Sequence, residues 1–494
     1  MESADVRYVA YGICVSKQTA HQWSEIIDVL LQKHSIKKPM VFQYELDFNE
    51  LLLDFRKFKP KYTCFVAEPL EITRDYYNSL HSFVCQIDEN SFYSATIFGI
   101  LTGPDKETAL KIAANSIPLN ISTVLSNTKI NFSPFKTGYT YSEIQKNLMY
   151  TKINGETVES EEGPDDIVKN LVDHINKNEV DLMITSAHAK ENDWRPAFCY
   201  PGGCFKYEKD TNDLIGVDLD KEVHKINSTN PKIYLGCGNC LIANMKPPNC
   251  MCLSWMKSAN AVQFVGYTVP SWFGFAGWGI NKYFIETPAR FSLAEAYFAN
   301  LQVLNYYKNL HDTNQKTDEE FKKGLDYEQN VVILYGDPAW RASICSESEN
   351  FENLLPYKMT VEEIKPKVWK VEVLCLKDCM WECPIPDDKD TVPGRPPFLI
   401  FKERFENKLK VIEGKLELTD LFAMMPLEGS SKKGDAHIAI FMEISEEIVV
   451  NEKKEKINKE AEKINTEKEK INFKEEKKIN KEKEKINKVK KNAI

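Results

Sequence analysis

The sequence lacks the features that mark secreted, membrane-spanning and nucleic-acid-binding proteins. It contains no run of about 18 apolar residues, the length that a membrane-spanning helix requires. Its first residues, MESADVRYVAYG, do not combine a basic stretch with a long apolar one, as a secretory signal does. Its formal net charge is −9, which argues against a general nucleic-acid binder. We therefore expect a cytoplasmic protein that binds neither membranes nor nucleic acids.

The sequence also lacks a disulfide framework. It has 13 cysteines in 494 residues, an odd number without even spacing, so most should be buried thiols in a reducing compartment. Hydrophobic residues make up 43% of the chain, which is enough for a core in each of two or three domains.

Residues 1–350 alternate between strand-like and helix-like segments. Short apolar runs that end in small or polar residues are typical of buried parallel strands. They are YTCFVAEP, SATIFGILTG, VDLMITSAH, KIYLGC, AVQFVGYT and VVILYGDP. Helical spacing appears between them in KETALKIAANS, DDIVKNLVDHINKNE and SLAEAYFANLQVLNYYKNL. The pattern predicts an α/β fold with a mostly parallel sheet and helices on both faces. The acidic stretch NGETVESEEGPDD predicts an exposed loop near residue 160.

The rest of the chain divides into two regions of different composition. Residues 355–448 contain strand-like runs joined by polar loops, which predicts a small β-rich, immunoglobulin-like domain. Residues 451–494 repeat KEKIN with 16 Lys and 10 Glu, and their isoleucines supply one apolar residue per heptad. That is half of a coiled-coil seam. A charged helix or a disordered tail is the preferred interpretation, and a weak coiled coil is the alternative.

Reactive side chains follow two of the predicted strands. His188 comes after VDLMITSAH, and Cys237 and Cys240 come at the end of KIYLGCGNC. Ligands of open α/β sheets lie beyond the carboxyl ends of the strands, so these side chains can meet at one edge. An imidazole can take the proton of a thiol and later protonate a leaving amine. The pattern therefore favours nucleophilic catalysis by a cysteine.

Small residues surround the candidate nucleophile. Gly236 and Gly238 allow a substrate backbone to approach closely. The backbone N–H groups of Cys240 and Ala189 are candidates for holding a developing oxyanion.

The same cysteines support a second interpretation. Cys237 and Cys240 form a C-x-x-C pair, the spacing of redox dithiols and zinc knuckles, and Cys250 and Cys252 follow closely. The second pair has C-x-C spacing, and the first ends a buried strand, which argues against zinc. We therefore expect no metal and no cofactor.

Several motifs resemble the gingipain-type cysteine peptidases, which belong to the caspase-like (clan CD) enzymes. SAHA and GNCLI each follow a strand, and ILYGDPAWR lies near residue 340; with the flanking blocks, the resemblance covers roughly residues 40–345. It implies a caspase-like three-layer α/β sandwich with peptide-bond hydrolysis by a Cys–His dyad, followed by a β-sandwich domain. His188 matches the histidine of this dyad and Cys240 its nucleophile. The chain departs from the family at Ala189, where the family usually has glycine.

Three further residues complete the expectations. Trp272 and Trp278, in PSWFGFAGWG, are candidates for walling a substrate pocket, with core packing as the alternative. Asp337 is expected to order a turn before Pro338 through bonds to backbone amides.

The predicted function is that of a cysteine-type endopeptidase acting on peptides or proteins, with Cys240 as nucleophile and Cys237 as second choice. A catalytically inactive peptidase fold that serves as a binding scaffold is the alternative, and a thiol redox or zinc module is a weaker one. A protein partner that binds the C-terminal domain or the tail is a further expectation.

Overall fold

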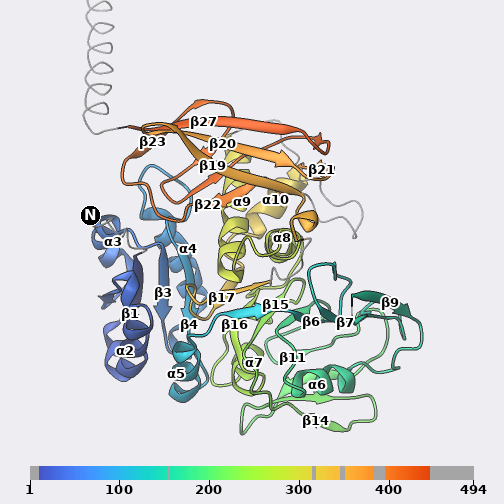
Figure 1. Cartoon of the computed structure of the whole chain (residues 1–494). Helices are drawn as coiled ribbons and strands as arrows, with labels where there is room; N and C mark the ends of the chain where they lie inside the picture. Colours follow the sequence, from blue (N-terminus) through green and yellow to red (C-terminus); the bar gives the residue numbers. More distant parts are fainter. Residues whose placement is uncertain (1–9, 154, 314–318, 345–350, 382–394, 445–494) are drawn as a thin grey trace, which may run out of the picture.

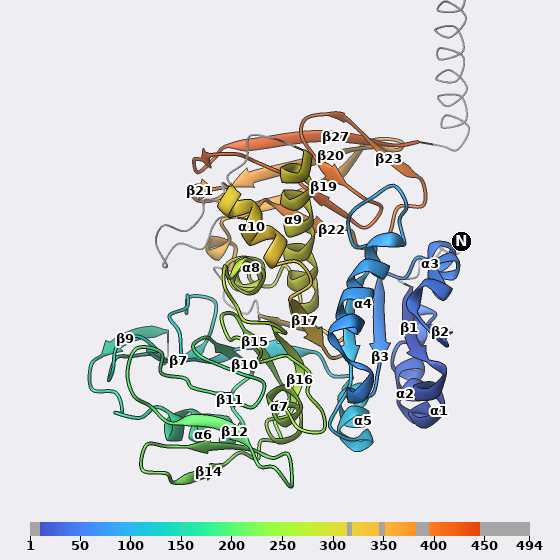
Figure 2. The ribbon, with the colours of Figure 1, turned by 180° about the vertical axis from the view of Figure 1, so that it is seen from behind.

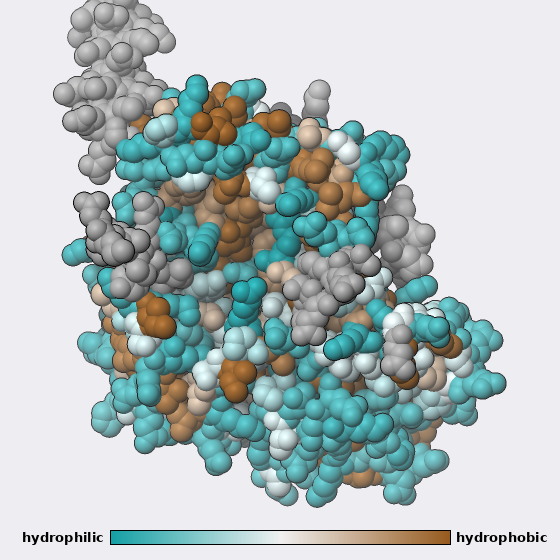
Figure 3. All heavy atoms as spheres, viewed as in Figure 1, coloured by the Kyte–Doolittle hydropathy of each residue, from teal (hydrophilic) through white to brown (hydrophobic). Residues whose placement is uncertain are grey.

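The computed structural model describes residues 10–153, 155–313, 319–344, 351–381 and 395–444. The predicted tail at 451–494 lies outside these residues. Within them, no helix is long and apolar enough to cross a membrane. Hydrophilic residues cover most of the face seen in Figure 3, with apolar side chains in separate patches.

A twelve-stranded sheet runs through the larger part of the molecule (Figure 1), in the order β2-β1-β3-β4-β17-β16-β15-β10-β6-β7-β8-β9. The strands are β1 (Tyr11–Ser16), β2 (Met40–Tyr44), β3 (Tyr62–Val66), β4 (Ile97–Leu101), β6 (Thr123–Ser126), β7 (Thr137–Tyr141), β8 (Met149–Ile153), β9 (Glu156–Ser160), β10 (Leu182–Thr185), β15 (Lys232–Gly236), β16 (Ala261–Tyr267) and β17 (Val332–Tyr335). Most neighbours are parallel, which confirms the predicted α/β class.

The direction of β17 differs from the expectation. This strand runs antiparallel to β16 and pairs with β4 through Tyr335 and Ile100. It thereby joins two parallel sets, β2-β1-β3-β4 and β16-β15-β10-β6-β7. An apolar run such as VVILYGDP reports burial but not direction, because direction depends on how the preceding helices return the chain.

Helices cover both faces of the second parallel set. In Figures 1 and 2, α8 and α9 lie on the side toward the C-terminal domain, and α6 and α7 lie on the opposite side. The buried residues of α6 (Val168, Leu171, Val172, Ile175) recur at helical spacing, which gives this helix one apolar face. The helices are α1 (Lys17–Gln22), α2 (Ser24–Lys33), α3 (Leu52–Phe58), α4 (Arg74–Gln86), α5 (Lys106–Ala114), α6 (Val168–Asn176), α7 (Met251–Ser258), α8 (Phe275–Phe284), α9 (Leu293–Thr313) and α10 (Glu319–Tyr327).

The acidic stretch near residue 160 begins as a strand rather than a loop. Residues Glu156–Ser160 form β9, which pairs with β8 as the last strand of the sheet. Its side chains are almost all exposed, since an edge strand needs a partner on one side only. A separate antiparallel sheet follows, made of β11 (Asp193–Trp194), β12 (Cys204–Tyr207), β13 (Leu214–Val217) and β14 (Val223–Lys225).

The C-terminal region forms antiparallel sheets around its own apolar cluster. One sheet contains β19 (Tyr357–Lys365), β20 (Val368–Cys375), β27 (Ala436–Ile444) and β23 (Lys408–Glu413), and a second contains β22 (Phe398–Ile400), β25 (Phe422–Met424) and β24 (Glu417–Leu418). Two further pairs are β21 (Cys379–Met380) with β26 (Ser430–Ser431) and, in the larger domain, β18 (Ala342–Ile344) with β5 (Leu119–Ile121). Phe398 and Phe422 pack against Phe298 of α9, so the second sheet rests on the larger domain.

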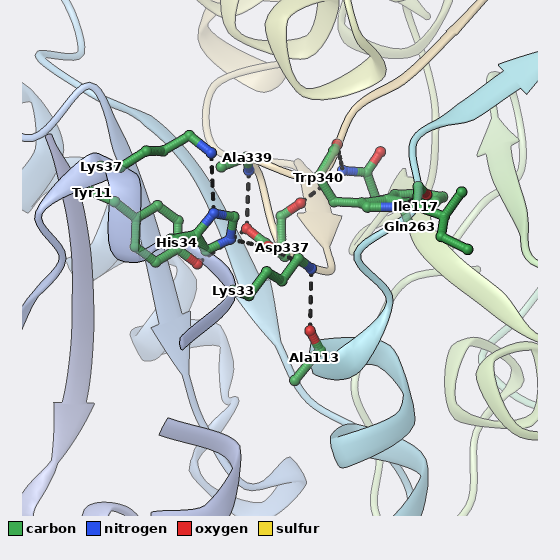
Figure 4. Close-up of polar contacts among 10 residues, drawn as sticks. All are labelled: Tyr11, Lys33, His34, Lys37, Ala113, Ile117, Gln263, Asp337, Ala339 and Trp340. Carbon is green, nitrogen blue, oxygen red and sulfur yellow. Dashed lines mark hydrogen bonds and ion pairs between the residues drawn. The ribbon is translucent and has the colours of Figure 1, made fainter. Parts of the chain in front are cut away.

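Asp337 orders the turn after β17, as expected, and it also binds side chains from the N-terminal part of the chain. Its Oδ1 accepts a hydrogen bond from the Ala339 N–H at 3.0 Å. It also accepts one from the Tyr11 hydroxyl at 3.0 Å, while Oδ2 lies 2.7 Å from His34 Nε2 and 2.8 Å from Lys33 Nζ (Figure 4). The carboxylate is fully buried. It therefore ties the end of β17 to β1 and α2, in the first parallel set.

Candidate functional site

Two neighbouring strands, β10 and β15, deliver the candidate residues to one edge of the sheet. They are parallel, entirely buried, and in register at Thr185 and Gly236, their last residues. The loops that follow are bonded to each other. The Cys237 N–H donates to the Thr185 carbonyl at 2.9 Å, and Asn239 Nδ2 donates to the Ser186 carbonyl at 2.7 Å. The two loops therefore contact each other at this edge of the sheet.

Cys240 is the partly accessible cysteine of the second loop. Its side chain is half-buried, and its Sγ accepts a hydrogen bond from the Ser271 N–H at 3.3 Å. Sγ also lies 3.8 Å from the Ser271 carbonyl oxygen. Ser271 therefore contacts the Cys240 sulfur through both its N–H and its carbonyl oxygen.

Cys237 lies in a different environment. Its side chain has no exposed surface, and Asn281 Nδ2 of α8 donates to its Sγ at 3.0 Å. Burial raises the pKa of the Cys237 thiol far above its ordinary value, and the Asn281 bond offsets only part of this. A buried neutral thiol is a poor nucleophile. Cys240 is thus the better placed of the two predicted candidates.

His188 is exposed beyond the end of β10. Its ring stacks on Phe198, with centroids 4.5 Å apart, and its carbonyl accepts from the Arg195 N–H at 2.8 Å. Within the described part of the chain, no hydrogen bond joins His188 to Cys240. Catalytic hydrogen bonds often form only when substrate is bound.

Each candidate residue has a neighbour with left-handed backbone. Ala187 precedes His188 with φ 79°, and Leu241 follows Cys240 with φ 57°. Residues other than glycine adopt this conformation at a cost of about 1–2 kcal/mol each. Such strain persists where the surrounding structure imposes it, and it clusters at functional sites.

The backbone at Ala189 has an N–H outside the local strand pairing. Ala189 forms an isolated antiparallel bridge with Trp194, through hydrogen bonds donated by the amides of Lys190 and Arg195. The amide of Ala189 is not used in this pairing.

The two candidate pocket tryptophans lie in different surroundings. Trp272 is 65% exposed and lines an open groove of about 590 Å³ with Phe273 and residues of α10. Trp278 is half-buried, and its Nε1 lies 3.5 Å from where a Cβ on Gly238 would stand. Trp272 thus presents its ring to an open groove, whereas Trp278 lies against the loop that carries Cys240.

Glu143 is a residue that the sequence did not single out. It is 8% exposed, and its backbone carbonyl accepts from the amides of Phe198 and Cys199. Burial raises the pKa of its carboxyl to about 7, although hydrogen bonds from Thr128 and Ser186 lower it. No local pattern marks it, since it follows a strand in an ordinary polar stretch. The hydrogen bond from Ser186 and the effect of this carboxyl on the pKa of Cys237 place Glu143 beside both candidate loops.

The other acidic residues near His188 have structural partners. Glu191 pairs with Lys246 at 3.1 Å, and Asp193 belongs to β11. Cys250 and Cys252 are buried with their sulfurs 3.4 Å apart. Among the described residues, no three His, Cys, Asp or Glu side chains group as a metal site would require.

The chain is an α/β protein in which a partly exposed cysteine, Cys240, and an exposed histidine, His188, follow the adjacent parallel strands β15 and β10. No protein-family model matches the chain, and no curated protein sequence does. The chain is similar to a crystal structure of the Arg-specific cysteine proteinase gingipain R (RgpB), with a TM-score of 0.45 and 11% identity over 90% of this chain and 94% of that one. It is also similar to the complex of Porphyromonas gingivalis RgpB pro- and mature domains, with a TM-score of 0.44 and 11% identity over 88% and 93% of the two chains. Similarity of this degree does not transfer an activity, which has to come from the residues of this chain.

Proposed function

We propose that the protein is a cysteine peptidase in which Cys240 is the nucleophile and His188 the general acid and base. The observation that supports this most directly is the contrast between the two cysteines of one loop. Cys240 is partly exposed and receives the Ser271 N–H, whereas Cys237 is fully buried. A nucleophile needs access to its substrate, which Cys240 has and Cys237 lacks.

The proposed reaction has two stages. The Cys240 thiolate attacks the carbonyl carbon of a peptide bond, and the negative charge moves to the carbonyl oxygen, near the amides of Ala189 and Cys240. His188, holding the proton that came from the thiol, gives it to the departing amine as the C–N bond breaks. Water, deprotonated by His188, then attacks the acyl-enzyme, which releases the carboxylic acid and restores the thiol.

Labelling with an electrophile tests the proposal. The purified protein is treated with a peptidyl acyloxymethyl ketone near neutral pH, and the modified cysteines are mapped by mass spectrometry. Cys199 is exposed and supplies the rate of an ordinary surface thiol within the same sample. Cys240 is expected to react much faster than Cys199 in the wild type, and at a rate similar to Cys199 in the His188→Ala variant.

Two variants complete the experiment. Cys237→Ser should leave the labelling of Cys240 unchanged, because the Cys237 side chain has no exposed surface. If Cys240 reacts no faster than Cys199 in the wild type, the dyad is absent, and the inactive scaffold becomes the better description. If Cys237 takes the label, the nucleophile assignment is wrong.

A further inference from the structure

A buried carboxylate, Glu328, lies behind the segment that contacts Cys240. It follows α10, and it is 1% exposed. Gly274 donates its N–H to Oε1 at 3.0 Å, and Ala276 donates its N–H to Oε2 at 2.9 Å. The Tyr267 hydroxyl also donates to Oε2, at 2.9 Å. Donors from two separate segments therefore converge on a single carboxylate.

Tyr267 and the backbone at the start of α8 hold both carboxyl oxygens of Glu328. Tyr267 accepts a hydrogen bond from the Gly277 N–H at 2.9 Å, so its own proton is free to point at the carboxylate. Gly274 thus donates to Oε1, while Ala276 and Tyr267 donate to Oε2. Burial raises the pKa of Glu328 above its ordinary value, and the hydrogen bonds from Ala276 and Tyr267 offset only part of this rise.

The segment held by Glu328 touches the loop of Cys240 at three points. Ser271 bonds to the Cys240 sulfur. A Cβ on Gly277 would stand 2.1 Å from the Cys237 carbonyl oxygen, which shows how closely the two backbones approach. Trp278 stands against Gly238. A shift of the start of α8 would therefore move the partners of the candidate nucleophile.

We infer that Glu328 is a positioning residue for the candidate active site, holding segment 271–278 so that Ser271 and Trp272 present a fixed surface beside Cys240. This inference rests on the proposed peptidase function. Trp272, next to Ser271, is braced by Phe273 and Tyr327, and Tyr327 directly precedes Glu328. The carboxylate and the exposed ring thus belong to one packed unit.

Glu328→Gln is the sharpest probe, because it keeps the shape and loses one acceptor. The amide nitrogen of glutamine cannot accept from Gly274 or Ala276, so one anchor is lost. Asp181→Asn is the matched control. Asp181 also holds two backbone amides, of Ser122 and Thr123, at 2.8 and 2.9 Å, but it precedes β10 at the opposite end from the candidate site. Tyr267→Phe is a second variant, which loosens Gly277 while keeping the carboxylate.

Two measurements are made on the full chain. Hydrogen exchange of the peptide covering residues 268–278 is expected to accelerate about tenfold or more in Glu328→Gln and to stay at the wild-type rate in Asp181→Asn. The rate constant of Cys240 with the peptidyl ketone should fall about tenfold, while that with iodoacetamide should change less than about threefold. A purely structural role would lower both rate constants equally.

The outcomes separate the two proposals. Wild-type protection of residues 268–278 in Glu328→Gln, or faster exchange with an unchanged peptidyl-ketone rate, overturns the inference. If Glu328→Gln does not fold, hydrogen exchange and the Cys240 labelling rates are measured on Tyr267→Phe instead. We expect smaller changes there, in the same directions. A failed peptidase function has a different signature, namely wild-type Cys240 whose reaction with either reagent is independent of His188.

Discussion

His34 and Asp337 are 303 positions apart in the chain, yet His34 Nε2 lies 2.7 Å from the Asp337 carboxylate in the buried interior. Lys37 Nζ lies 3.1 Å from the other ring nitrogen, Nδ1. An ammonium can only donate a hydrogen bond, and a carboxylate can only accept one. The tautomer that fits both contacts has Nδ1 accepting from Lys37 and the Nε2–H donating to Asp337. The ring therefore bridges a buried carboxylate and a lysine, as Figure 4 shows.

Replacing Asp337 should destabilise the fold strongly. Asp337→Asn leaves Lys33 buried without its counter-charge, which costs about 3–5 kcal/mol in pairs of this kind. Chemical denaturation measures the change. Asp378→Asn, which breaks an exposed pair with Lys432, is the control and should cost about 1 kcal/mol or less. Equal losses in the two variants would contradict the buried-pair argument.

The same carboxylate predicts acid sensitivity. Burial alone would raise the pKa of Asp337, but Lys33 and His34 lower it more, so the net pKa lies well below its ordinary value. A lowered carboxyl pKa adds stability above the unfolded-state value of 3.8, and this stability is lost as the pH falls below it. Thermal melting between about pH 5 and 2 should show a smaller loss in Asp337→Asn than in the wild type.

The raised pKa of Glu143 predicts that the fold loses stability as the pH rises toward neutral. Burial raises the pKa of its carboxyl from 4.5 to about 7, so its neutral form is favoured in the folded state. Its contribution to stability is full below 4.5 and is lost as the pH rises toward 7. Melting temperatures across this window should decline less in Glu143→Gln. In the Glu107→Gln control, at an exposed position, the melting temperature should decline with pH as it does in the wild type. The same decline in all three proteins would refute a raised pKa for Glu143.

Gly277 should tolerate no side chain. A Cβ there would stand 2.1 Å from the Cys237 carbonyl oxygen and 2.7 Å from the Tyr267 ring. Gly277→Ala is expected to cost about 3 kcal/mol, the upper part of the range for overpacking. Gly434→Ala is the comparison, because its φ of 94° imposes strain in open space, at a cost of about 1–2 kcal/mol. A smaller loss in Gly277→Ala than in Gly434→Ala would show that the two backbones separate easily.

We expect Trp272 to contribute to the binding of substrate and little to the stability of the fold. Trp272→Ala removes an exposed ring, so the free energy of unfolding should change by about 0.5 kcal/mol or less. Once a peptide substrate is found, its kcat/KM should fall about fivefold in this variant, since a lost aromatic contact is worth about 1 kcal/mol. Leu46→Ala, at a site 87% exposed on another strand end, should alter neither quantity.

Local patterns in the sequence were sufficient for the sheet class and for the position of the two loops. The buried runs of β10 and β15 end where His188, Cys237 and Cys240 begin, and parallel neighbours bring such ends together. The amphipathic spacing of α6 likewise marked its buried face. These features depend on residues within one turn or one strand of each other, so the order of apolar and polar residues encodes them.

Other features were decided by the tertiary structure. The sequence could not tell that Cys237 is buried and Cys240 partly exposed, because both follow the same strand and only α8 and Ser271 distinguish them. Nor could it tell that Asp337 binds Lys33 and His34, that Glu328 holds the start of α8, or that β17 runs antiparallel to β16. Each of these depends on the path of the chain between distant segments. Burial and hydrogen bonding at such positions follow from packing in three dimensions, which no short stretch of sequence contains.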